Sequence, residues 1–229
     1  MSRYFHYIFC HTLFQTNSNQ QLLRGKGSGG EVGISFLPVV DGKFLRGNSK
    51  DIYKDNHIND AVSIIGTNAD EGLMTMMAVF PDNTEEEPVV DSATFDRLAQ
   101  PHIAQISSEP IITDTMKLMY YNYSCKEAPD CNHLMGITQL VGDHFFVCPI
   151  DKVTKAFVQA GRKVYRYHMT HAPTTSVFGT KWTRSNHGDD LAFVFGMPFI
   201  LSKKYSFTEE EAKMSLQVIK YWTNLAKTG

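Results

Sequence analysis

The 229-residue sequence has neither an excess of basic residues nor a long hydrophobic run. It contains 22 Lys and Arg against 24 Asp and Glu, for a net charge of −2, and no basic stripe that could neutralise a row of phosphates. No apolar run approaches the roughly 18 to 20 residues that a membrane-spanning helix needs. We therefore expect no nucleic-acid partner and no membrane span, and the 42% hydrophobic content predicts one globular core.

Cysteine is also scarce, and no pair of cysteines has the CxxC spacing of a zinc site. The four residues, Cys10, Cys125, Cys131 and Cys148, allow three disulfide pairings, and we expect no metal or other cofactor. Cys125 and Cys131 could close a short loop, and Asn122 opens a glycosylation sequon just before them. Both features suit a secreted protein or one of the endomembrane lumen. The alternative is a chance sequon beside two free thiols.

A serine nucleophile motif of the form Gly-x-Ser-x-Gly is missing as well. Ser28 lies among glycines in residues 24–33, but Lys26 occupies the position where the motif needs a glycine. We interpret residues 1–33 as a poorly defined N-terminal segment with a glycine-rich linker. The first eleven residues have a basic start, yet two histidines interrupt the apolar stretch and no cleavage site follows, so they do not predict a signal peptide.

Strand and helix patterns alternate along residues 34–229. Residues 61–65 are β-branched and mostly apolar, as in a strand of a parallel sheet that is covered on both faces. Residues 164–169 alternate as a second strand. Helices are predicted at residues 73–80, 92–100, 109–123 and 149–160 and from a capping box at Thr208 to the end of the chain. This alternation predicts an α/β fold with a mostly parallel sheet, of which two or three strands are recognisable.

Two loops beyond the predicted strands hold candidate catalytic residues, because open parallel sheets place their sites at the carboxyl ends of strands. The first loop contains Glu71 and the second contains His187. An acid on one loop and a histidine on a later one follow the order nucleophile, acid, histidine of α/β-hydrolases. The acid would fix the tautomer of a neutral histidine that accepts a proton. Spacing alone leaves open a solvated Glu71 and a structural His187.

Five blocks of residues carry a family resemblance. They are FLPVVDG (36–42), IGTNADEG (65–72), VGDH with CP (141–144 and 148–149), HGDDLAFVFG (187–196) and YWTNLAKTG (221–229). In content and order they resemble the type-B carboxylesterase and cholinesterase family. The resemblance implies an incomplete α/β-hydrolase over residues 34–229, the C-terminal portion of a mostly parallel sheet flanked by helices.

The same resemblance implies roles for individual residues. Glu71 matches the acid and His187 the histidine of a Ser–Glu–His triad that cleaves carboxylic esters through an acyl-serine. Cys148 is similar to a family cysteine whose disulfide partner lies further towards the C-terminus, and His171 falls near a structural histidine. The nucleophile elbow and the glycine-rich oxyanion loop have no counterpart here, so we expect the acid and histidine without the nucleophile. A small carboxylic ester is then the expected substrate of the complete parent.

The residues after Glu71 indicate what kind of substrate pocket the family resemblance implies. Cholinesterases usually place aromatic residues there, whereas this chain has Leu73, Met74 and Thr75, so the resemblance implies a general esterase pocket. Met74 is a candidate for contact with substrate, and core packing is the alternative. Two other readings of the whole chain stay open, namely a non-catalytic cholinesterase-like adhesion domain and an inactive truncated product. The sequence leaves the oligomeric state undetermined.

Overall fold

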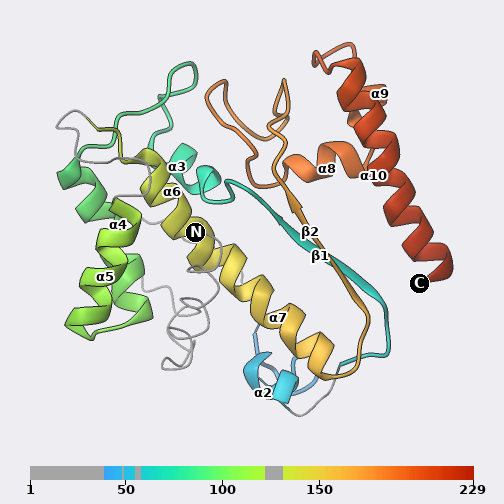
Figure 1. Cartoon of the computed structure of the whole chain (residues 1–229), viewed down its shortest axis with the longest axis horizontal. Helices are drawn as coiled ribbons and strands as arrows, with labels where there is room; N and C mark the ends of the chain where they lie inside the picture. The colour runs from blue at the N-terminus through green and yellow to red at the C-terminus, as the bar shows by residue number, and fades with distance from the viewer. Residues whose placement is uncertain (1–38, 48, 55–57, 122–130) are drawn as a thin grey trace.

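A computed structural model describes residues 39–47, 49–54, 58–121 and 131–229 of the chain (Figure 1). Helices dominate these residues, and two strands lie among them. The elements in chain order are α2 (Ser49–Lys54), β1 (Ser63–Asn68), α3 (Leu73–Val79), α4 (Ser92–Ile106), α5 (Pro110–Tyr121), α6 (Leu134–Gly142), the π-helix η1 (Asp143–Val147), α7 (Cys148–Gln159), β2 (Val164–Met169), α8 (Asp189–Val194), α9 (Met197–Ile200) and α10 (Glu209–Thr228).

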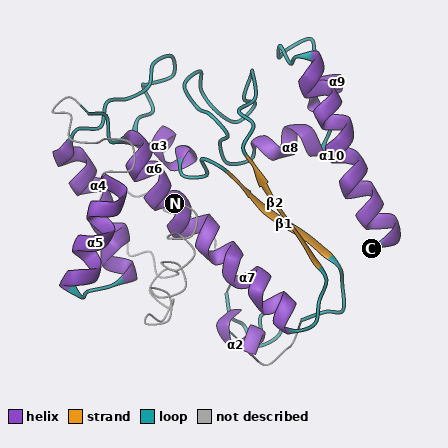
Figure 2. Ribbon diagram, in the orientation of Figure 1, coloured by secondary structure: helices purple, strands orange, loops and turns teal. Residues whose placement is uncertain are grey.

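The two strands form a parallel pair at the centre of the molecule (Figure 2). Their register aligns Ser63 with Val164 and Asn68 with Met169, so both carboxyl ends meet at one edge. β1 begins and ends later than the predicted residues 61–65 and runs through Gly66. A β-carbon at Gly66 would lie 2.3 Å from the Tyr167 ring, so the glycine makes room for that ring in the neighbouring strand. Helices flank a small parallel sheet, as expected for part of an α/β fold.

Helices lie on both sides of the strand pair (Figure 1). α7 contacts both strands from one side, and α10 contacts β1 and α8 from the other. α6, η1 and α7 follow one another without a break, so this long helical stretch leads from the neighbourhood of α3, α4 and α5 to the sheet. The predicted capping box at Thr208 and the predicted strand at Val164–Met169 are confirmed.

The main hydrophobic core lies among α3, α4, α5 and α6, which we call the helical lobe. Its twelve buried residues are Met76, Val90, Phe95, Ala99, Ile103, Ile106, Met116, Tyr120, Leu134, Ile137, Leu140 and Val141. α4 continues six residues past its predicted end at Gln100 although Pro101 lies inside it. The apolar spacing of Phe95, Ala99 and Ile103 continues on the core face, and its burial offsets the lost backbone hydrogen bond of the proline.

The loop after β1 packs closely on the helical lobe. A β-carbon at Gly72 would lie 2.1 Å from the Thr138 carbonyl oxygen and 2.9 Å from the Gly142 nitrogen. Only glycine permits this approach, so Gly72 fixes the start of α3 against the backbone of α6. The residue before it, Glu71, is thereby held at a defined position beyond the end of β1.

Candidate active site

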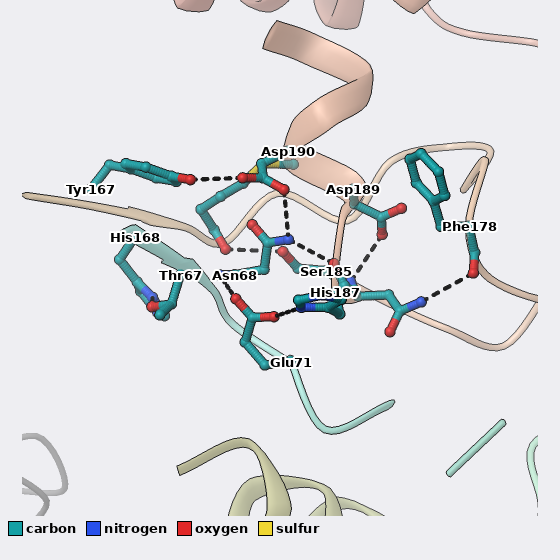
Figure 3. A network of polar contacts seen from close by, with 12 residues as sticks. Thr67, Asn68, Glu71, Tyr167, His168, Phe178, Ser185, His187, Asp189 and Asp190 are labelled. Atoms are coloured by element: carbon teal, nitrogen blue, oxygen red, sulfur yellow. Dashed lines mark hydrogen bonds and ion pairs between the residues drawn. The ribbon is translucent and has the colours of Figure 1, made fainter. Parts of the chain in front are cut away.

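Glu71 and His187 meet beyond the carboxyl ends of the two strands (Figure 3). The Glu71 Oε2 atom lies 2.6 Å from the His187 Nδ1 atom. The other carboxylate oxygen, Oε1, accepts a 2.6 Å hydrogen bond from the backbone N–H of Asn68, the last residue of β1. Both oxygens of the buried carboxylate are therefore engaged, and the glutamate cannot rotate without losing one of these bonds.

Backbone pairing brings the two loops together from positions 116 residues apart. Asp70 forms an isolated parallel bridge with Asn186, and the Asp70 N–H donates to the Ser185 carbonyl at 3.0 Å. The Ser185 hydroxyl in turn donates to the Met169 carbonyl at the end of β2. The parallel pairing of the strands thus continues into the loops, and it sets Glu71 and His187 side by side.

The hydrogen bond to Glu71 decides which ring nitrogen of His187 is available for chemistry. When Nδ1–H donates to the carboxylate, a neutral imidazole keeps its lone pair on Nε2. The hydrogen bond that His187 donates to Glu71 raises the pKa of His187 above its ordinary value, burial opposes this increase, and the charges of Glu71 and Asp190 add to it. The His187 side chain remains 40% exposed. The pair can therefore act as an oriented general base that accepts a proton at Nε2.

Polar contacts hold the His187 loop from the side of the strands (Figure 3). The Asn68 side-chain amide donates to the Asn186 carbonyl at 2.7 Å and to Asp190 Oδ1 at 3.2 Å. Asp190 Oδ2 accepts from the Tyr167 hydroxyl at 2.7 Å, and burial together with this bond raises the pKa of Tyr167. β1, β2 and α8 are thus tied together directly behind the histidine.

Asp189 fixes the same loop from within. Its Oδ2 atom accepts from the Asn186 N–H at 2.9 Å, and its Oδ1 atom accepts from the Ser176 hydroxyl at 2.6 Å. Burial raises the pKa of Asp189 to about 6, against the opposing effect of these two donors. Gly188 precedes it with φ +87°, a conformation that favours glycine. The turn that presents His187 therefore depends on a glycine and a buried carboxyl group.

Comparison with known proteins identifies the family of the chain. The model of the carboxylesterase family matches residues 10–229. The chain belongs to the carboxylesterase family. It is similar to acetylcholinesterase of Bungarus fasciatus, with 26% identity over 198 residues, and to acetylcholinesterase of Leptinotarsa decemlineata, with 29% identity over 204 residues. These alignments cover 85% and 87% of this chain but 31% of each relative, so the chain spans about a third of their length.

Of the other predicted site residues, the structure describes some and leaves others outside the described ranges. Met74 lies on α3 with 40% of its surface exposed, whereas Met76 is a core residue. Contact between Met74 and a substrate stays a prediction. Asn122 and Cys125 lie outside the described residues, so the sequon and the pairing of Cys125 with Cys131 also stay predictions.

Cys131 and Cys148 are both disulfide-bonded. The partner further towards the C-terminus that the family resemblance implied for Cys148 stays a prediction. Among the described residues no group of three His, Cys, Asp or Glu could hold a metal ion. No helix in this part of the chain is long and apolar enough to cross a membrane.

Sequence reasoning missed several residues of the site. Asn68 lies three residues after the end of the predicted strand at residues 61–65, and its place near a carboxyl end was a usable signal. The pattern around Tyr167 predicted only an alternating strand and no contact with the site. Phe146 packs its ring on His187, with 4.5 Å between ring centroids, and nothing in the spacing of residues 141–149 indicates this contact.

Proposed function

We propose that this chain supplies the acid and the histidine of a Ser–Glu–His triad for the hydrolysis of carboxylic esters. Glu71 is the acid and His187 the general base, and the nucleophilic serine belongs to a part of the protein outside the sequence printed here. Membership of the carboxylesterase family supports ester hydrolysis. The observation that carries the proposal is the 2.6 Å contact between Glu71 Oε2 and His187 Nδ1, with Glu71 Oε1 anchored on the N–H of Asn68.

In this proposal, the serine hydroxyl gives its proton to His187 Nε2 while the serine oxygen attacks the ester carbonyl carbon. The imidazolium that forms is stabilised by the Glu71 carboxylate. His187 then gives the proton to the departing alkoxide, which leaves an acyl-serine. Water repeats the sequence, with His187 again as base and then as acid. Glu71 keeps its charge throughout, because its role is to hold the tautomer and to offset the imidazolium charge.

The proposal extends to the compartment of the protein. Disulfides persist mainly in oxidising environments, and Cys131 and Cys148 are both disulfide-bonded. This supports a secreted protein or one of the endomembrane lumen. Small carboxylic esters are the proposed substrates, since Leu73 and Met74 rather than aromatic rings follow Gly72.

The test starts from the transcript that encodes the chain. Sequencing upstream should give a Gly-x-Ser-x-Gly motif, and the protein expressed from it should hydrolyse p-nitrophenyl acetate and react with a fluorophosphonate serine probe. The present chain alone should do neither above background. In the longer protein, His187→Gln should abolish turnover and probe labelling, because no other group accepts the serine proton.

His171→Gln provides a matched control. His171 also contacts a buried glutamate, Glu211, at 3.0 Å, so the substitution removes a histidine of similar exposure from a similar pair. Its turnover per folded molecule should match that of the unaltered protein. Near-normal turnover in His187→Gln would contradict the triad assignment. A longer protein in which the motif serine is replaced would instead favour a non-catalytic adhesion domain.

A further inference from the structure

An aromatic ring covers one side of the proposed general base. The ring of Phe146 lies 4.5 Å from the imidazole of His187, centroid to centroid, with an angle of 37° between the two planes. Phe146 is partly buried, and it comes from η1, far from either loop of the pair in sequence. Aromatic rings this close together have preferred relative orientations, so the contact limits how the imidazole can turn.

The π-helix that carries Phe146 is tied to the helical lobe at its first residue. At the first residue, Asp143 Oδ2 accepts a 2.8 Å hydrogen bond from the Tyr120 hydroxyl of the helical lobe. Directly after the last residue, Cys148 is held in a disulfide. π-helical turns are rare and occur frequently at functional sites. The hydrogen bond from Tyr120 therefore ties the start of this turn to the helical lobe rather than to the loop that presents His187.

We propose that Phe146 is a positioning residue for His187. Its ring restricts the imidazole to orientations in which Nδ1 stays on Glu71, and its π face stabilises the imidazolium that forms when Nε2 accepts a proton. The catalytic part of this inference rests on the proposed function. The packing part concerns this chain alone and can be tested without any activity.

The adjacent residue offers a matched control within the same turn. Phe145 is 41% exposed and stacks on His144 at 4.7 Å, with no ring contact to His187. Glu71 and Asp190 are the charged groups whose fields act on His187, and neither is altered by a change at residue 145 or 146. A change in the titration of His187 that occurs only at residue 146 therefore reports the loss of the Phe146 ring.

The first experiment follows the imidazole Cε1–H signals of the full chain by NMR between pH 4 and pH 9, with His187→Gln to assign the His187 signal. Phe146→Leu should lower the pKa of His187 by roughly half a unit, because leucine keeps apolar volume but has no π face. Phe146→Tyr should restore the original value, and Phe145→Leu should leave it unchanged. If Phe146→Leu loses the native spectrum, Phe146→Trp and Phe146→Met repeat the comparison of an aromatic with an aliphatic side chain.

An unchanged His187 titration in the folded aliphatic variant would overturn the inference, as would an equal decrease in Phe145→Leu. The second experiment uses the longer protein described above. Phe146→Leu should lower kcat about tenfold with little change in KM and shift the acidic limb of the pH–rate profile downwards, and Phe146→Tyr should rescue both. If the NMR result holds and the longer protein has no esterase activity, the proposed function fails while the packing role of Phe146 stands.

Discussion

The chain contains two histidine–glutamate pairs that are alike in composition and different in arrangement. His187 and His171 have similar side-chain exposures of 40% and 42%, and Glu71 and Glu211 are 7% and 2% exposed. In the first pair the glutamate contacts Nδ1 at 2.6 Å, and no described residue hydrogen-bonds Nε2. In the second pair the glutamate contacts Nε2 at 3.0 Å. The nitrogen that projects furthest from the backbone is therefore free in one pair and used in the other.

The two glutamates also differ in their other partners. Glu71 accepts one backbone hydrogen bond, from Asn68, and its other oxygen contacts His187. Glu211 accepts from the backbone N–H groups of Thr174 and Thr208, and it completes the capping box of α10. Burial alone would raise the pKa of Glu211, but the hydrogen bonds from Thr208, Thr174 and His171 hold it below its ordinary value. The second pair thus ties a loop to a helix end, whereas the first orients an imidazole ring.

The largest expected difference between the pairs concerns turnover in the longer protein. Glu71→Gln keeps the shape of the side chain but removes the charge that fixes the His187 tautomer. An acid-to-amide change in a serine protease triad lowers turnover about ten-thousand-fold, and we expect a decrease of similar size here. Steady-state kinetics with p-nitrophenyl acetate, normalised to active-site labelling, measure it.

Glu211→Gln is the control for this substitution. It should leave turnover per folded molecule within about twofold, because Glu211 touches none of the reacting groups. Equal losses in the two variants would remove the distinction between an orienting and a structural pair.

The sequence predicted the members of the first pair but not the reason why they differ from the second. Glu71 and His187 stood out because each lies in a loop after a recognisable strand and within a family block. The contacts that fix them were not predictable, since Asn68, Asn186 and Asp190 meet only through strand pairing across more than 100 residues. His171 could be placed near a structural histidine by resemblance, yet its glutamate lies forty residues away on α10.

The fold was predictable to a similar extent. The capping box, β2 and α7 follow local rules of period and capping, and the structure places them where those rules do. η1 was not predictable, because five residues of π-helix between two α-helices leave no distinct apolar period. The ring contact of Phe146 depends on that turn, and it was therefore not predictable from local patterns either.

The variant that should keep its turnover, Glu211→Gln, should nevertheless lose stability. Glu211→Gln loses at least one charged hydrogen bond to a backbone donor, and we expect the free energy of unfolding to fall by about 2 kcal/mol. The folded-state pKa of Glu211 is below its ordinary value of 4.5, so its contribution is complete above about pH 4.5 and is lost as the pH falls through the folded-state pKa. Urea unfolding at pH 7 and below pH 4 should therefore show a difference between variant and wild type that narrows with acid. A constant difference across this range would contradict the assignment.

The smallest expected effect concerns Met74, which lies three residues after Glu71 and tests whether the surface beside the first pair receives substrate. Met74 is 40% exposed and Met76 is 1% exposed on the same short helix, so Met74→Ala should change the free energy of unfolding by less than about 0.5 kcal/mol, while Met76→Ala should cost roughly 2 to 5 kcal/mol. If substrate packs on the Met74 thioether, Met74→Ala should raise the KM of the longer protein for butyrate esters by roughly two- to tenfold. The increase for acetate esters should be smaller, because a shorter acyl chain covers less of the side chain. Parallel measurement of KM for p-nitrophenyl acetate and p-nitrophenyl butyrate decides the matter. Equal KM values for wild type and Met74→Ala with both esters would assign Met74 to the solvent-facing side of α3 and leave the acyl group to be bound by residues elsewhere in the protein.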